Sequence, residues 1–200
     1  SAGGIQGARS MIAILLNDAS FEQDIRELLM AFYPGETFTH KEEEAGEAEL
    51  IVRGVRDGNS FSLDVTPVKK EAVHFALIYP DFSNRFETKN EIKQTLYRLL
   101  SARTGRELPW GTLTGIRPTK IALTKLYDGW TDEQIETYMR ETYFTSKEKI
   151  DLSIDVAERE RRLLSTIDYE NGYSLYVGIP FCPTTCLYCS FTSFPIVKWE

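Results

Sequence analysis

The sequence has little cysteine: it holds three cysteines among 200 residues, and all three lie within residues 182–189. An odd number confined to one short segment argues against a disulfide framework and favours metal binding or catalysis in a reducing compartment. Long apolar runs are also missing, since none approaches the ~20 residues that a membrane-spanning helix needs. Positive charge is not in excess either, because 30 acidic side chains outnumber 23 basic ones and the net charge is -7. We therefore expect a cytoplasmic protein with no membrane segment and no nucleic-acid-binding surface.

What remains is ordinary globular composition, with 42% hydrophobic and 26% charged residues. This excludes a wholly disordered or collagen-like chain, and the length suggests one to two domains. Residues 1–10 read SAGGIQGARS, which is small and polar and has no period. We interpret them as an artificial leader before Met11, with a natural flexible N-terminus as the alternative.

Residues 11–85 predict a small α+β unit in the order β-α-β-β. The apolar run Ile12–Asn17 is typical of a buried strand. Apolar side chains then recur at helical spacing from Phe21 to Phe32, and Pro34-Gly35 ends that helix. Ser20 and Gln23 have the spacing of a capping box at its start.

A β-hairpin is predicted next. Residues 49–55 and 61–68 both alternate apolar and polar side chains, and Asp57-Gly58-Asn59 lies between them. Val73–Tyr79 is an ambiguous third strand, because its alternation is not clean. The glutamate-rich run Lys41–Glu49 lacks the turn glycine and oxygen spacing of a calcium loop, so we expect a solvated loop or strand edge there.

Residues 86–168 predict an all-helical segment. Thr131 with Gln134 and Thr145 with Glu148 have capping-box spacing. The expected helices cover residues 87–104, 118–129, 131–143 and 145–167.

The loop Trp110–Lys120 within this segment has two interpretations. Its hydroxyls and cations precede a helix N-terminus, where anions are favoured. The alternative is a connector whose Pro109 and Trp110 pack in the core. The side chains of the hypothetical anion site are Thr112, Thr114, Arg117, Thr119 and Lys120.

The pattern that carries chemistry comes last. Residues 173–179, YSLYVGI, predict a buried strand, and Cys182, Cys186 and Cys189 follow with the spacing C-x3-C-x2-C. Iron–sulfur clusters are usually held by four cysteines, so three ligands leave one iron of a four-iron cluster open to a small molecule. A structural zinc site lacks a nearby fourth ligand, and a redox C-x-x-C pair would leave Cys182 unexplained.

These residues resemble the radical S-adenosylmethionine (SAM) superfamily. More narrowly, LYVGIPFCPTTCLYCSF and PWGTLTGIRPTK resemble the HemZ branch of the oxygen-independent coproporphyrinogen III oxidase-like proteins. The resemblance implies that Cys182, Cys186 and Cys189 bind a [4Fe-4S] cluster. It also implies that Tyr176 contacts SAM and that Tyr188 lies against the SAM adenine. Gly178 stands where the family motif usually has histidine, so the role of that histidine is not carried over.

The resemblance further implies an oxidoreductase of heme biosynthesis. SAM would yield a 5′-deoxyadenosyl radical, which takes a hydrogen from a propionate of coproporphyrinogen III or a related tetrapyrrole, and loss of CO₂ would leave a vinyl group. The sequence indicates no electron donor. The alternatives are a heme-binding or heme-delivery protein that shares the motif, and a regulatory or interaction module formed by the N-terminal region.

Residues 172–200 are expected to form the first strand and cluster loop of a radical SAM (β/α) barrel. One strand–helix unit of such a barrel takes roughly 30 residues, and the whole barrel roughly 250. We therefore expect the chain to be an N-terminal fragment with a truncated barrel, and to be inactive alone.

Overall fold

The computed structural model describes residues 10–68, 73–115, 117–168, 171–184, 191 and 194–195. Its contacts separate two compact units, which divide between Arg161 and Arg162. Within the described ranges, no helix combines the length and apolar character that crossing a membrane requires.

The N-terminal unit contains a mixed five-stranded sheet in the order β2-β1-β3-β4-β5. β1 runs parallel to both β2 and β3, whereas β3, β4 and β5 are successively antiparallel. This mixed sheet with helices agrees with the predicted α+β class. The strands are β1 (Met11–Leu16), β2 (Thr37–Thr39), β3 (Leu50–Asp57), β4 (Ser60–Pro67) and β5 (His74–Ile78).

The predicted hairpin is confirmed. Asp57 pairs with Ser60, so Gly58 and Asn59 form a two-residue turn, and Gly58 has the positive φ of 56° that such turns need. The ambiguous third strand is β5, an antiparallel partner of β4. No sequence pattern indicated β2, which has only three residues and pairs with the edge of β1.

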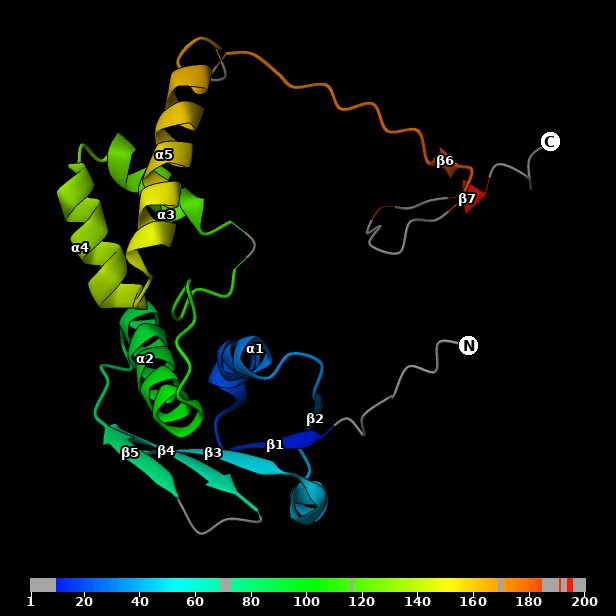
Figure 1. The fold of residues 1–200 in the computed structure, drawn as a ribbon, viewed down its shortest axis with the longest axis vertical. Helices are drawn as coiled ribbons and strands as arrows, with labels where there is room; N and C mark the ends of the chain where they lie inside the picture. The colour runs from blue at the N-terminus through cyan, green and yellow to red at the C-terminus, as the bar shows by residue number, and fades with distance from the viewer. Residues whose placement is uncertain are drawn as a thin grey trace. The chain divides into compact units, whose positions relative to one another are not determined.

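Two helices cover one face of the sheet, as Figure 1 shows: α1 (Glu22–Phe32) and α2 (Arg85–Thr104). The glutamate-rich run forms a short 3-10 helix, η2 (Glu42–Glu47), on the opposite face, where Ala45 packs with Ala13 and Leu15. Full burial of a leucine, isoleucine or phenylalanine contributes about 1.5–3 kcal/mol, so the helix-covered face holds most of the apolar stabilisation. Its fully buried side chains include Ile14, Ile25, Leu28, Leu29, Phe32, Val52, Phe61, Leu63, Val65, Ile92, Leu96 and Leu100.

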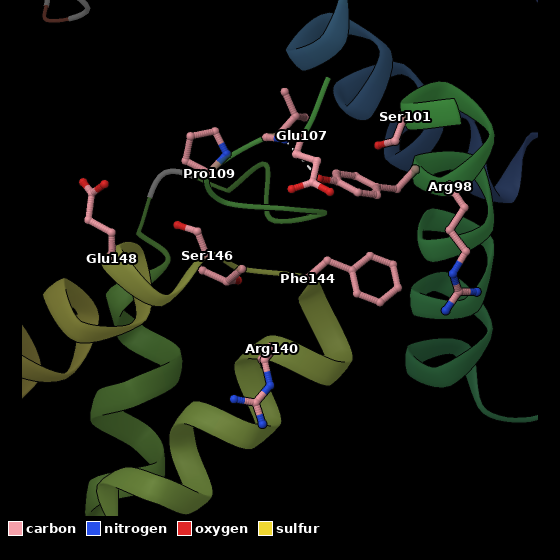
Figure 2. Close-up of a pocket in the computed structure, with 11 residues that line it drawn as sticks. Arg98, Ser101, Glu107, Pro109, Arg140, Phe144, Ser146 and Glu148 are labelled. Carbon is pink, nitrogen blue, oxygen red and sulfur yellow. Dashed lines mark hydrogen bonds between the residues drawn. The ribbon is translucent and has the colours of Figure 1, made fainter. Parts of the chain in front are cut away.

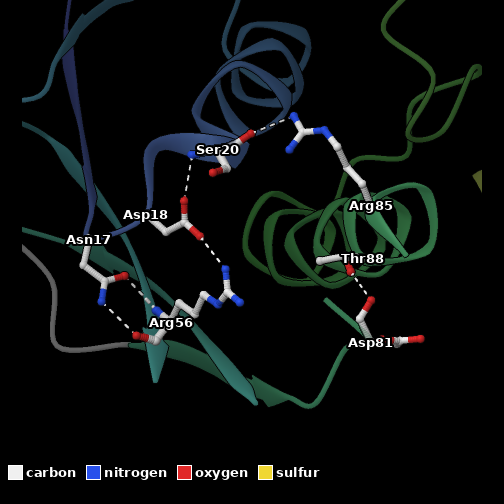
Figure 3. A network of polar contacts seen from close by, with 7 residues as sticks. All are labelled: Asn17, Asp18, Ser20, Arg56, Asp81, Arg85 and Thr88. Carbon is white, nitrogen blue, oxygen red and sulfur yellow. Dashed lines mark hydrogen bonds and ion pairs between the residues drawn. The ribbon is translucent and has the colours of Figure 1, made fainter. Parts of the chain in front are cut away.

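A polar network joins the end of β1 to the hairpin and to both helices (Figure 3). The Asn17 side chain pairs with the backbone of Arg56 in both directions, at 2.8 Å each. Asp18 accepts from the Arg56 guanidinium at 3.1 Å, and Arg85 donates to the carbonyl of Ser20 at 3.0 Å. The hydrogen bonds that Asp18 accepts from Ser20, followed by its contact with Arg56, lower the pKa of this carboxyl.

The predicted capping box of Ser20 and Gln23 is wrong. Asp18 is the cap instead: it accepts the backbone N–H of Ser20 at 2.9 Å and opens the short 3-10 helix η1 (Ala19–Phe21) that precedes α1. Gln23 binds Glu27 one turn further on, at 2.8 Å. With Asp18 as the cap, Ser20 lies inside the 3-10 turn and does not have the extended conformation of a cap residue.

The helical part holds α3 (Thr119–Tyr127), α4 (Asp132–Tyr143) and α5 (Lys147–Leu164). These helices share a second core that includes Ile135, Met139 and Ile150. The capping box of Thr131 and Gln134 is confirmed, with both reciprocal hydrogen bonds present.

The capping box predicted at Thr145 and Glu148 is wrong, because Ser146 is the cap instead. Ser146 Oγ accepts the backbone N–H of Lys149 at 3.4 Å, and the Ser146 carbonyl accepts that of Ile150. Thr145 lies before the helix with a buried hydroxyl that has no partner in the described part of the chain. Two adjacent hydroxyl residues have nearly equal capping ability, so the packing of the preceding turn decides between them.

The C-terminal unit differs from its prediction as well. Residues 173–180 form no strand, and their apolar side chains are exposed. A strand needs a partner for its backbone groups, and these residues join no sheet among those described. A short parallel ladder follows instead, between β6 (Phe181–Cys182) and β7 (Phe194–Pro195).

Candidate functional site

The cysteine segment begins at β6. Cys182 is half-buried and forms no disulfide. The ladder pairs Cys182 with Pro195, and the Phe194 N–H donates to the carbonyl of Pro180 at 2.7 Å. The two ends of the segment that carries the other cysteines are therefore held together. Cys186, Tyr188 and Cys189 lie outside the described residues.

Tyr176 precedes this ladder in extended chain and is 81% exposed. A Cβ atom at Gly178 would lie 3.3 Å from Tyr176 Cε1. The tyrosine ring thus leans over the position where the family motif has histidine, and a larger residue there would require the ring to move. Its predicted contact with SAM stays a prediction.

The donor set of this segment fits an iron–sulfur cluster by its chemistry. Thiolates are the soft ligands that such clusters use, and the segment supplies three of them within eight positions. Among the described residues, no three His, Cys, Asp or Glu side chains are grouped as metal ligands.

A second candidate site lies in the N-terminal unit. We name it the α2–α5 cleft, a cavity of about 720 Å³ between α2, the loop 107–109 and the turn from α4 to α5. This volume is within the range of small-molecule sites. Figure 2 shows Arg98 and Ser101 of α2 on one wall and Ser146 on the opposite one, with the Glu107 carboxylate and the Phe144 ring between them.

Backbone hydrogen bonds hold the walls of the cleft together. The Leu108 N–H donates to Tyr97 Oη at 3.0 Å, and the Ser146 N–H donates to the carbonyl of Pro109 at 2.9 Å. The loop also touches α4, because the Thr112 N–H donates to the carbonyl of Tyr143 at 2.7 Å. The cleft is therefore a preformed feature of the packed unit.

Phe144 supplies the floor of the cleft in an unusual conformation. Its φ of 57° and ψ of 29° are left-handed, and it is the only non-glycine residue with positive φ among those described. Such a conformation costs of order 1–3 kcal/mol and persists where packing enforces it. Here the ring packs on Tyr97 with centroids 5.5 Å apart, and the Arg98 guanidinium lies 4.9 Å from its centre.

A third polar group is the cluster of Lys93, Thr114, Glu27 and Asp24. Lys93 Nζ donates to Thr114 Oγ1 at 2.9 Å, and that hydroxyl donates to Glu27 at 2.7 Å. Burial lowers the pKa of Lys93 and raises the pKa of Asp24. Hydrogen bonds from Gln23, then from Thr114, lower the pKa of Glu27. None of these four residues lines the α2–α5 cleft. Their hydrogen bonds connect α1, α2 and the loop before α3, so we interpret the cluster as structural.

The hypothetical anion site in the loop 110–120 is not assembled. Thr112 bonds to α4 and Thr114 to the buried cluster, while Arg117 pairs with Glu160. The connector interpretation is closer to the structure, although Pro109 is exposed at the rim of the cleft. The cleft was missed from the sequence because its side chains come from separated segments with no common pattern.

Comparison with known proteins relates the chain to the oxygen-independent coproporphyrinogen-III oxidase-like proteins, which confirms the resemblance read from its motifs. One relative is HemZ of Bacillus subtilis (strain 168), which is 36% identical over 135 residues. The alignment covers 66% of this chain and 26% of HemZ, so the chain spans about a quarter of the relative's length.

Other comparisons add little. No protein-family model matches the chain. A solved structure, TolB from Acinetobacter baumannii, aligns with 52% of this chain and 30% of its own at 15% identity, with a TM-score of 0.35. A likeness this weak carries no argument about fold or function.

Proposed function

We propose that the protein containing this chain is a radical SAM oxidoreductase of heme biosynthesis that acts on coproporphyrinogen III. The observation that carries the proposal is the C-x3-C-x2-C segment at residues 182–189 in a chain related to HemZ. Neither the segment nor the relationship alone would be enough, because three cysteines can bind other metals and the alignment covers a quarter of the relative.

In this proposal Cys182, Cys186 and Cys189 hold a [4Fe-4S] cluster, and the β6–β7 ladder keeps the ends of their loop together. The cluster and SAM, when bound, supply the one-electron chemistry for converting propionate groups to vinyl groups. Tyr176 and Tyr188 line the SAM site. Residues 172–200 are the first strand and loop of the barrel, whose remaining strands would give Tyr173–Ile179 the partner it lacks among the described residues.

The test is anaerobic reconstitution of the protein with iron and sulfide, beside a variant with all three cysteines changed to alanine. We expect about four iron and four sulfide per chain in the parent and background amounts in the variant. Equal iron and sulfide in both would contradict the metal assignment.

Activity is tested separately by adding SAM, a reductant and coproporphyrinogen III to the loaded protein. We expect 5′-deoxyadenosine and the divinyl product, and loss of SAM binding with the cluster retained in Tyr176→Ala. Stoichiometric heme binding without SAM-dependent turnover would instead identify a heme-binding or heme-delivery protein.

A further inference from the structure

Two opposite charges line the α2–α5 cleft without pairing. Arg98 and Glu107 both face the cavity, and neither forms an ion pair in the described part of the chain. Arg98 is held over the Phe144 ring instead, and Figure 2 shows the Glu107 carboxylate in the middle of the cleft. A guanidinium offers two parallel donors to a carboxylate, and a carboxylate accepts from an ammonium group.

The wall opposite Arg98 also favours negative charge in the cleft. α5 begins at the cleft, and its first-turn N–H groups carry the partial positive charge of a helix N-terminus. The C-terminus of α4 would oppose an anion, but its last carbonyls are occupied. Gln94 donates to those of Glu141 and Thr142, and Thr112 donates to that of Tyr143. Arg140 adds a second guanidinium to the lining of the cleft, and this group also forms an ion pair with Glu136, with 3.0 Å between Nη1 and Oε1.

Two residues that line the cleft have buried hydroxyls without a partner in the part of the chain that the structure describes. Thr145 lines the cleft and is 3% exposed, yet its hydroxyl has no hydrogen-bond partner among the described residues. Ser101, on the opposite wall, has a buried hydroxyl in the same condition. A buried polar atom without a partner costs about 1–3 kcal/mol, and native structures retain few of them.

The remaining walls are apolar: Tyr97, Leu108, Pro109 and Phe144 surround the polar groups. A ligand that matches this surface has a carboxylate, an ammonium group and an apolar body. Figure 2 shows the Glu148 carboxylate directed away from the centre of the cleft, and it accepts from Lys149 of its own helix at 2.9 Å.

We propose that the α2–α5 cleft binds a small zwitterion of the α-amino acid class with an apolar side chain. Arg98 receives the carboxylate, Glu107 receives the ammonium group, and the aromatic floor receives the side chain. The residues of this proposal all belong to the N-terminal unit, and the proposal does not depend on the function proposed for the cysteine segment.

The experiment is a titration of the 200-residue chain with L-leucine, L-methionine and L-phenylalanine, followed by amide NMR shifts. At least one amino acid should cause saturable shifts centred on Arg98, Glu107 and Ser146. The amide of that amino acid, which lacks the carboxylate, and its N-acetyl derivative, which lacks the ammonium, should each bind about 10- to 100-fold more weakly.

Two variants locate the charges. Arg98→Gln should weaken binding of the free amino acid but not of its amide, and Glu107→Gln should weaken binding of the free amino acid but not of its N-acetyl derivative. Both side chains are exposed, so the variants should fold, and thermal unfolding checks this. Arg159→Gln, on the exposed surface of α5, is the matched control and should bind like the parent.

The proposal is overturned if none of the three amino acids causes saturable shifts up to ~10 mM, a limit that corresponds to very weak affinity. It is equally overturned if binding is unchanged in Arg98→Gln and Glu107→Gln, or if the N-acetyl derivative binds as well as the free amino acid.

Discussion

Thr114 shows how a single side chain connects distant parts of the N-terminal unit. Its hydroxyl accepts from Lys93 of α2 and donates to Glu27 of α1, while its backbone belongs to the loop before α3. Lys93 is buried, and burial lowers its pKa, so the ammonium group depends on the few partners it has.

Changing Thr114 to valine should therefore destabilise the protein by about 1–3 kcal/mol, because Lys93 Nζ stays buried and loses its hydrogen bond. Urea unfolding followed by circular dichroism measures the change. Thr137→Val, at an exposed position on α4, is the matched control and should change the free energy of unfolding by less than about 0.5 kcal/mol. Equal effects of the two substitutions would mean that the cluster contributes nothing.

Of the three capping boxes predicted from single residues and their spacing, one is correct and two are wrong. Thr131 and Gln134 satisfy each other within one turn, so local spacing was sufficient. Ser20 and Thr145 each have a competing cap within two residues, Asp18 and Ser146, so the spacing pattern alone did not identify the cap.

Among the elements, the loop between α2 and α3 forms one wall of the cleft. It can approach the end of α4 because Gly111 has no side chain: a Cβ there would lie 1.9 Å from the Tyr143 carbonyl oxygen. Its φ of 57° also favours glycine.

Gly105 offers a comparison that separates these two effects. It too has a positive φ, 67°, but a Cβ there would meet no atom within 4 Å. Gly105→Ala should cost about 1–2 kcal/mol for the left-handed backbone alone. Gly111→Ala should cost at least about 2 kcal/mol more, because the backbone must also move apart. Chemical unfolding of the two variants checks the difference, and a Gly111→Ala variant no less stable than Gly105→Ala would contradict the close contact.

Helices and strands were predicted correctly where a periodic apolar pattern was followed by a glycine that ends the element. α2 ends at Thr104 with Gly105 as its C-cap, as expected, and the hairpin turns at Gly58. The prediction failed for residues 173–179, whose composition favours a strand but which have no described neighbour to supply backbone hydrogen bonds.

For the whole molecule, the main division lies between Arg161 and Arg162. Before it, the sheet and helices form well-packed cores; after it, the described residues 173–180 expose most of their side chains.

This contrast predicts where a protease cuts first. Tyr173 and Tyr176 are 93% and 81% exposed in extended chain, whereas Tyr97 and Tyr143 are 7% exposed within helices. Chymotrypsin cleaves after aromatic residues in accessible, unpaired backbone, so brief digestion should cut near Tyr173 or Tyr176 and leave the N-terminal unit intact. Mass spectrometry of the early fragments is the measurement. Early fragments ending at Tyr97 or Tyr143 would show that the N-terminal unit opens as easily as the segment after it.

Local sequence was sufficient for the strands β1, β3 and β4, for the apolar faces of α1 and α2, and for the cysteine pattern at residues 182–189. Each of these features depends on residues that are close together in the sequence and therefore also close together in space. The α2–α5 cleft could not be found in this way. Arg98, Glu107 and Ser146 belong to separate elements, and they face one cavity because Gly111 lets the loop pack against α4. Long-range packing sets those positions, and no local pattern encodes them.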